Sequence, residues 1–265
     1  MDFWLPVLVV LAANFLFFFY CLWMKDNTYM DVFWGLSFVF PLAALIVKKY
    51  IKDGQVRPDL RAWITFGLVT SWALRLSIHI GLRLNGEDFR YKKWREEWTA
   101  LGGTWGYIWR SLVNVFMIQG LVSLVNNASS IFIVIYSASG SLIWLDYVGI
   151  VIAVFGFGFE WLADDQLRRH LAEKNPGMPQ FIKWGLWRYS RHPNYFGETV
   201  FWLGIYLIAC SINWGWITFF APLTITLLMR FYSGVAMLED KYSDNLEFQA
   251  YKQETNVYVP WFVRS

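Results

Sequence analysis

Residues 185–198 read GLWRYSRHPNYFGE, and they place Arg188, Arg191 and His192 immediately before an apolar run. Pro193 suits the first turn of a helix, where its missing N–H would have no intrahelical partner in any case. The free N–H groups and the dipole at such a helix start attract anions. Arginine side chains beside it suit phosphate or carboxylate groups. The stretch therefore predicts an anion-binding helix start at residue 193.

Further polar side chains fall inside apolar runs, where ionisable groups are costly and mark functional sites by default. Their spacing of three or four residues puts them on shared helix faces. Such faces must turn inward, so we expect them to line a polar cavity, although buried ion pairs that orient the helices would leave the same pattern. The residues are Arg75, His79 and Arg83, then Glu160, Asp164 and Arg168, then Asn194 and Glu198, with Asp31 at the start of another run.

The composition indicates an integral membrane protein, because the 265 residues are 57% hydrophobic and only 16% charged. No basic patch suggests nucleic-acid binding. We expect one all-α domain over residues 1–265, with about seven membrane-spanning helices. The predicted spans are residues 4–23, 31–47, 63–83, 110–136, 144–163, 195–212 and 214–230.

The basic residues predict the orientation of these spans, because Lys and Arg favour the cytoplasmic side. Seven spans place segments 84–109, 164–194 and 231–265 on one side, and these carry most of the lysines and arginines outside the spans, Lys174 and Arg264 among them. The loop 48–62 is also basic and argues the other way. We expect the C-terminus to be cytoplasmic and the polar cavity to open toward the cytoplasm.

Several stretches together carry a resemblance to a known family. GLWRYSRHPNYFGE resembles the C-terminal signature of the membrane-embedded steroid 5-alpha-reductase-type family, which includes sterol C14 reductases and a large, little-studied branch. The stretches NTYMDVFWG, EDFRY, FEWLADDQL and AYKQETNVYVPWF are similar to that branch and follow in the same order between residues 27 and 262. Isoprenylcysteine carboxyl methyltransferases share the Arg-His-Pro-x-Tyr core and a similar acidic, tyrosine-containing tail.

The resemblance implies a multi-span reductase that binds NADPH from the cytoplasmic side, mainly through residues 160–262. Such enzymes transfer hydride to a carbon–carbon double bond of a lipid that enters from the bilayer. It implies no metal. Carried over motif by motif, the cofactor contacts would be Arg83, Asp164, Arg168, Tyr189, Arg191, His192, Asn194, Tyr195, Glu198, Glu239 and Tyr251.

The residues that would bind the substrate depart from the family's pattern. Steroid reductases of this family bind the substrate carbonyl with a glutamate and a tyrosine, whereas this chain has Asp31 as the early acid and Trp72 at the position matching the tyrosine. Tryptophan cannot donate a proton in that role, so the catalytic proton donor stays open among Asp31, Tyr91 and His79. A protonated carboxyl or a hydroxyl in an apolar site can polarise a carbonyl. Asp31 could equally be the N-cap of the second span.

Three functions fit these observations. The first is an NADPH-dependent reductase of a double bond in a lipid or steroid-like substrate. The second is an S-adenosylmethionine-dependent membrane methyltransferase, and the third is a non-catalytic subunit that keeps the fold and binds partner subunits in a membrane complex. NADPH carries a pyrophosphate and a further phosphate, so the four arginines of segment 164–194 favour the reductase. The polar side chains retained inside the spans argue against the third reading.

Overall fold

The computed structural model describes residues 3–53, 59–138, 140–173, 179–232 and 234–263, and every regular element within them is helical. This agrees with the predicted all-α class. Lys174, Arg264 and residues 54–58 of the basic loop lie outside the described residues. The chain divides into two compact units, and the prediction of a single domain stays a prediction.

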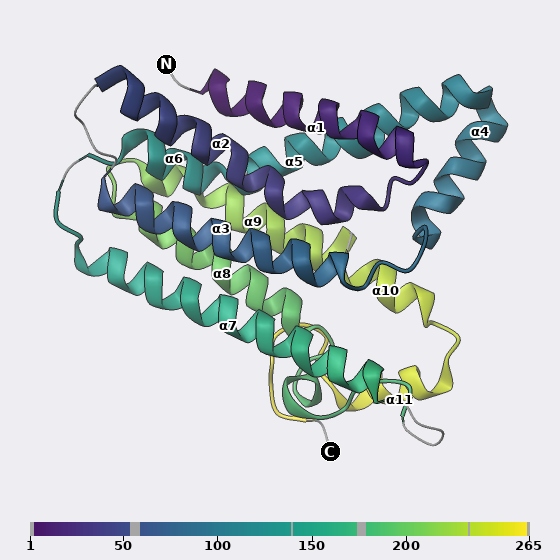
Figure 1. Ribbon diagram of the computed structural model, residues 1–265. Helices are drawn as coiled ribbons and strands as arrows, with labels where there is room; N and C mark the ends of the chain where they lie inside the picture. Colours follow the sequence, from purple (N-terminus) through teal and green to yellow (C-terminus); the bar gives the residue numbers. More distant parts are fainter. Residues whose placement is uncertain (1–2, 54–58, 139, 174–178, 233, 264–265) are drawn as a thin grey trace. The chain divides into compact units, whose positions relative to one another are not determined.

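Unit 1 comprises Met1–Leu142 and Ile212–Thr218. Its helices α1, α2 and α3 pack side by side in sequence order (Figure 1). A side chain at Gly35 would place its Cβ 2.8 Å from the carbonyl oxygen of Ala73, so glycine is what lets α2 and α3 approach closely here. The helices are α1 (Trp4–Met24), α2 (Tyr29–Asp53), α3 (Leu60–Gly81), α4 (Phe89–Arg110), α5 (Ile118–Asn126) and α6 (Ala128–Tyr136).

The predicted span 110–136 is not one regular helix. It begins at the end of α4, passes through a π-helical segment, Ser111–Met117, and continues as α5 and α6. Upstream, α4 bends at Gly102 and Gly103, where Gly103 has a φ of 62° that side chains rarely tolerate. The bend separates the charged first half of α4 from its apolar second half.

Unit 2 comprises Ile143–Ser211 and Phe219–Ser265. The long helices α7 and α8 lie side by side over most of the length of α8 (Figure 1). A Cβ at Gly197 would lie 2.6 Å from the backbone nitrogen of Glu160, so the start of α8 sits directly against α7. The helices are α7 (Trp144–Ala172), α8 (Pro193–Cys210), α9 (Phe220–Leu227), α10 (Val235–Lys241) and α11 (Leu246–Glu254).

Five helical segments of the described chain are long and apolar enough to cross a membrane, judged by length and composition. They support an integral membrane protein. The predicted spans 63–83 and 195–212 form α3 and α8 but are not among these five, so the expected count of about seven is not confirmed. The orientation of the C-terminus stays a prediction. The five segments are Trp4–Met24, Tyr29–Ile51, Phe89–Asn126, Trp144–Ala172 and Gly215–Lys241.

Candidate functional site

The stretch before α8 folds as a turn fixed to α7. Gly185 has a φ of 61° and begins a short 3-10 helix that ends at Arg188. The backbone N–H of Leu186 donates to Gln166 Oε1 at 2.9 Å, and Trp187 Nε1 donates to the Ala163 carbonyl at 2.9 Å. The helix then begins at Pro193, as the sequence predicts.

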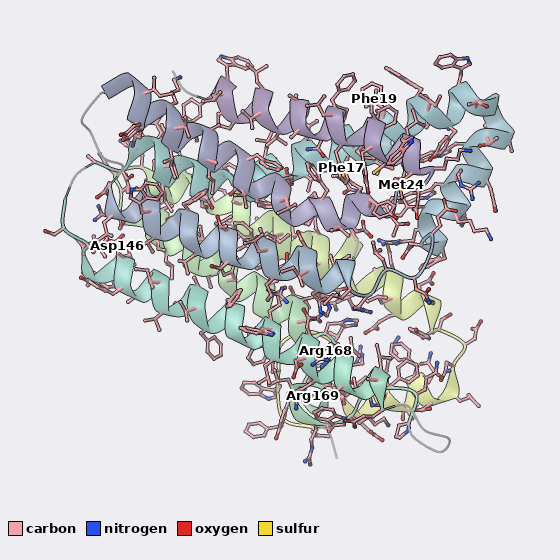
Figure 2. The ribbon with its side chains drawn as sticks, viewed as in Figure 1. Phe17, Phe19, Met24, Asp146, Arg168 and Arg169 are labelled. Atoms are coloured by element: carbon pink, nitrogen blue, oxygen red, sulfur yellow. The ribbon has the colours of Figure 1, made fainter. Side chains whose placement is uncertain are left out.

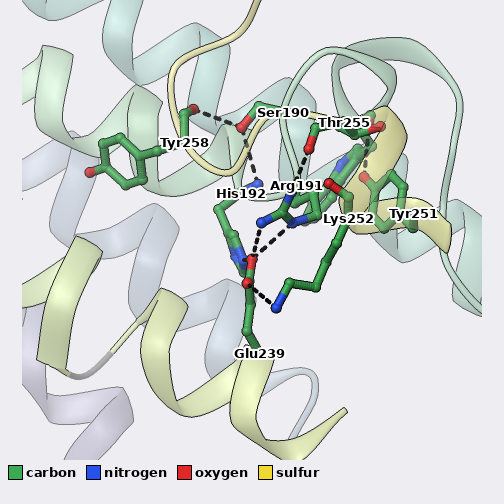
Figure 3. Close-up of polar contacts among 9 residues, drawn as sticks. Ser190, Arg191, His192, Glu239, Tyr251, Lys252, Thr255 and Tyr258 are labelled. Carbon is green, nitrogen blue, oxygen red and sulfur yellow. Dashed lines mark hydrogen bonds and ion pairs between the residues drawn. The ribbon is translucent and has the colours of Figure 1, made fainter. Parts of the chain in front are cut away.

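Arg191 is buried, and its guanidinium is bonded within unit 2 (Figure 3). Its Nε donates to Glu239 Oε1 at 2.8 Å, and its Nη1 donates to the carbonyls of Thr255 and Lys252. Its backbone N–H donates to the Asn256 carbonyl at 2.8 Å. Arg191 therefore joins the start of α8 to α10 and to the C-terminal tail, the motif AYKQETNVYVPWF at residues 250–262. Its predicted contact with the cofactor stays a prediction.

Glu239 is shared by three positively charged or titratable side chains. Besides Arg191, it contacts His192 Nε2 at 3.3 Å and Lys252 Nζ at 3.5 Å. Burial lowers the pKa of His192, while the contact with Glu239 raises it and offsets part of that effect. Near neutral pH the imidazole is therefore neutral and can donate from Nε2 to the carboxylate.

The C-terminal tail lies across the start of α8 (Figure 3). Ser190 Oγ donates to the Tyr258 carbonyl at 2.7 Å, and the Tyr258 hydroxyl donates to the Tyr195 carbonyl at 3.0 Å. The same hydroxyl lies 2.6 Å from Thr199 Oγ1. Burial raises the pKa of Tyr258 to about 12. Ser190 and Tyr258 were not among the predicted site residues, although both lie in the quoted motifs.

Two further tail contacts complete this attachment. The hydroxyl of Tyr251, a predicted cofactor residue, donates to the Trp187 carbonyl at 2.5 Å, and burial raises its pKa. The backbone N–H of Trp261 donates to the Tyr189 carbonyl at 3.1 Å. The motifs GLWRYSRHPNYFGE and AYKQETNVYVPWF are therefore held together by hydrogen bonds.

A polar face between α7 and α8 is present as the stripes predict. Asn194 Nδ2 donates to Asp164 Oδ1 at 3.1 Å. Glu160, Asp164 and Glu198 are all buried. The buried Oδ1 of Asn194 is an acceptor with no hydrogen-bond partner among the described residues.

Arg168 and Arg169 project from the last turns of α7 (Figure 2). Both pair with Asp165, each at 2.6 Å, and their side chains are 61% and 62% exposed. Arg168 therefore contacts Asp165 rather than continuing the face of Asp164. These arginines are accessible to an anion, whereas Arg191 is not exposed.

Unit 1 contains a second polar site around Asp31. The Tyr91 hydroxyl donates to Asp31 Oδ1 at 2.6 Å, and Arg90 Nη2 donates to Asp31 Oδ2 at 2.6 Å. Arg90 Nε also donates to Asp88 Oδ1 at 2.8 Å. Asp31 lies inside the first turn of α2, and its carboxylate binds residues of α4, so it does not act as the N-cap of the span.

The local fold explains how this second site forms. Asp88 caps α4 by accepting the N–H of Arg90 at 2.9 Å, and its own N–H donates to Thr28 Oγ1 at 2.9 Å. These bonds join the motifs NTYMDVFWG and EDFRY. Gln119 Nε2 donates to the Tyr91 hydroxyl at 3.4 Å. Arg90 and Gln119 belong to this site but were not predicted.

The structure brings two of the three candidate proton donors together. Asp31 and Tyr91 are in contact, whereas His79, half-buried near the end of α3, lies 3.3 Å from Nη1 of Arg83, which is exposed just beyond that helix. Arg83 belongs to unit 1, unlike the other predicted cofactor residues. Trp72 is fully buried against Phe38, with ring centroids 5.2 Å apart.

The fold is that of an all-helical protein with five segments long and apolar enough to cross a membrane, and each unit holds a cluster of ion-paired residues, around Asp31 in unit 1 and around Glu239 in unit 2. The family model described as "Protein of unknown function (DUF1295)" matches residues 17–255, and the chain belongs to this family, which is steroid 5-alpha-reductase-like. The chain is also similar to an uncharacterized protein of Schizosaccharomyces pombe, with 26% identity over 252 residues that cover 83% of this chain and 68% of the relative. No solved structure matches the chain.

Proposed function

We propose that the protein is an NADPH-dependent reductase of a carbon–carbon double bond in a lipid or steroid-like substrate. The observation that most supports it is the contact between the Tyr91 hydroxyl and the Asp31 carboxylate at 2.6 Å. Such a pair can polarise a carbonyl conjugated to the double bond and supply a proton. Membership of a steroid reductase-like family favours an oxidoreductase.

The contacts in unit 1 divide the roles within this pair. Arg90 donates to the second oxygen of Asp31, so both carboxyl oxygens of Asp31 accept hydrogen bonds. Tyr91 is then the member with a proton to donate, and Gln119 donates to its oxygen. We assign Tyr91 as the donor to the substrate carbonyl, with its O–H turning from Asp31 Oδ1 to that oxygen when the substrate is bound, and Asp31 as the group that positions the hydroxyl beforehand.

The residues of unit 2 fit a dinucleotide by the chemistry of their donors and acceptors. NADPH, when bound, supplies the hydride. Arg168 and Arg169 would bind phosphate oxygens. The Oδ1 of Asn194, which has no partner among the described residues, would accept from the carboxamide N–H of the nicotinamide. Arg191 would hold Glu239 and the tail in place around this site.

Equilibrium binding of NADPH and of S-adenosylmethionine to the purified protein tests the proposal. We expect NADPH to bind and the double variant Arg168→Ala/Arg169→Ala to bind it at least tenfold more weakly, since a charge-assisted hydrogen bond contributes about 1.5–3 kcal/mol. Arg95→Ala is the matched control, because Arg95 pairs with Glu87 in unit 1. Binding of S-adenosylmethionine without NADPH would point to a methyltransferase, and binding of neither would favour a non-catalytic subunit.

A further inference from the structure

The helix α5 buries polar residues and exposes apolar ones, and the start of α6 adds further buried polar residues. Ile118, Leu121 and Val125 are 46%, 50% and 39% exposed. A lipid-facing segment keeps its polar groups away from the hydrocarbon, so a polar inward face marks a feature of the interior. The buried residues of this stretch include Gly120, Ser123, Asn126, Asn127, Ser129 and Ser130.

The backbone carries this polar face across the junction between the two helices. The N–H of Asn127 donates to the Ser123 carbonyl and the N–H of Ile131 to the Asn127 carbonyl, both at 2.9 Å. Residues 119, 123, 126 and 130 therefore follow one helix face at helical spacing. At one end of that face Gln119 contacts the hydroxyl of Tyr91.

Some polar atoms of this stretch have protein partners. Ser123 Oγ donates to the Gly120 carbonyl at 2.8 Å, Ser129 Oγ donates to Thr218 Oγ1 at 3.0 Å, and Asn127 Nδ2 donates to the Phe38 carbonyl at 2.9 Å. These contacts hold the stretch within unit 1.

Other atoms of the same stretch have no hydrogen-bond partner among the described residues. They are both amide atoms of Asn126, the Oδ1 of Asn127 and the Oγ of Ser130. Asn126 and Ser130 are fully buried, and Asn127 is 1% exposed. An unsatisfied buried polar group costs about 1–3 kcal/mol, and native proteins satisfy nearly all such groups.

Asn14 of α1 adds an acceptor beside this face. Its Nδ2 donates to the Val10 carbonyl at 2.9 Å, and its buried Oδ1 has no partner among the described residues. A Cβ at Gly120 would lie 3.1 Å from Asn14 Nδ2, so Asn14 packs against the inward face of α5.

The buried atoms without hydrogen-bond partners indicate which kind of molecule can bind them. Three are amide oxygens, which only accept hydrogen bonds, while Asn126 Nδ2 donates and a hydroxyl does either. A ligand that satisfies them must donate more than one hydrogen bond and accept at least one. Anions and carbonyl groups cannot donate, whereas water donates two and accepts two.

We propose that unit 1 holds ordered, buried water along the inward face of α5 and α6, bonded to Asn126, Asn127 and Ser130. This water belongs to the native structure of unit 1. The same helix face carries Gln119, which contacts the Tyr91 hydroxyl, at its other end. The inference does not depend on the proposed reductase activity.

A density map of the whole protein, at a resolution that shows ordered water elsewhere in the molecule, tests the proposal. We expect isolated peaks 2.7–3.2 Å from the Asn126 amide and the Ser130 hydroxyl. The peaks should be present both in lipid nanodiscs and in delipidated detergent. Density continuous with a lipid chain and lost on delipidation, a cation at about 2.3–2.6 Å from several oxygens, or no peak at all would each overturn it.

A matched pair of serine variants gives an independent test by thermal unfolding. Ser123 has a protein partner, so Ser123→Ala should lower the Tm by about 2–4 °C, the shift that corresponds to one hydrogen bond in a protein of this size. If water bonds the Ser130 hydroxyl, Ser130→Ala should lower the Tm by a similar amount. A Tm that is unchanged or higher in Ser130→Ala would show that this hydroxyl is unbonded and would overturn the proposal.

Discussion

Both units place an arginine on a buried or partly buried carboxylate, but the surroundings of the two pairs differ. In unit 1, Arg90 leaves one oxygen of Asp31 for the hydroxyl of Tyr91. In unit 2, Glu239 is shared by Arg191, His192 and Lys252. The first pair sits beside a group with a transferable proton, and the second pair is enclosed by charges and backbone carbonyls. An ion pair of arginine and carboxylate therefore lies beside the proposed proton donor in unit 1 and fixes the start of α8 to α10 in unit 2.

The largest effect expected from this comparison is on turnover, in Tyr91→Phe. The substitution keeps the ring and removes the hydroxyl, so we expect a given substrate to be reduced about 100-fold more slowly or worse, because proton donation contributes at least that factor. NADPH affinity should be unchanged. Phe89→Leu, at an exposed position on the same helix, is the control. Normal turnover by Tyr91→Phe would remove Tyr91 from the chemistry.

Arg191→Ala should show the architectural role of the second pair. Removing the buried guanidinium takes from Glu239 the closest of its three partners and takes a donor from two tail carbonyls, so we expect a loss of about 3 kcal/mol in the free energy of unfolding. Thermal or denaturant unfolding measures it. The tail should also become more accessible to proteolysis. A variant with unchanged stability but weaker NADPH binding would instead place Arg191 on a phosphate, as the motif alone predicts.

Tyr258→Phe tests the attachment of the C-terminal tail to α8 without changing the ion pair of Arg191 and Glu239. It removes the hydroxyl that bonds Tyr195 and Thr199 but keeps the ring, so we expect a loss of about 1 kcal/mol in stability. If the tail positions the start of α8, NADPH affinity should fall severalfold and Thr199→Val should reproduce part of the loss. Unchanged affinity in both variants would limit the tail to a structural role.

His192 should produce the smallest effect, on the pH dependence of stability. Its folded pKa lies below the unfolded value of 6.5, so this contribution to stability is complete above about pH 6.5. It is lost as the pH falls toward the folded pKa, because the unfolded chain then binds the proton more readily. His192→Gln should make the free energy of unfolding less dependent on pH in this range. An unaltered pH dependence would show that His192 is not the group responsible.

Some of these features follow from the sequence and others do not. Pro193 marks the start of α8 because its preference for the first turn is local. The faces of Asp164 and Asn194 follow from helical spacing. The contact between Asp31 and Tyr91 joins residues 60 positions apart, and it depends on how Asp88 and Thr28 fix the start of α4.

The partners of Arg191 could not be predicted for a different reason. Two of them are the carbonyls of Lys252 and Thr255, and a backbone acceptor has no signature in residue type. The residue type alone does not tell Arg191 from the exposed arginines of α7. They differ in burial, which depends on how the helices of unit 2 pack.

The most direct test of the proposed function follows the hydride. The purified protein is incubated with NADPH deuterated at nicotinamide C4, with S-adenosylmethionine and with a total lipid extract of its source membrane, and the lipids are examined by mass spectrometry. We predict a lipid that loses one double bond and gains one deuterium from the cofactor and one hydrogen from solvent, and we predict that Tyr91→Phe abolishes this product. Transfer of a methyl group from S-adenosylmethionine, with no deuterium entering any lipid, would contradict the account.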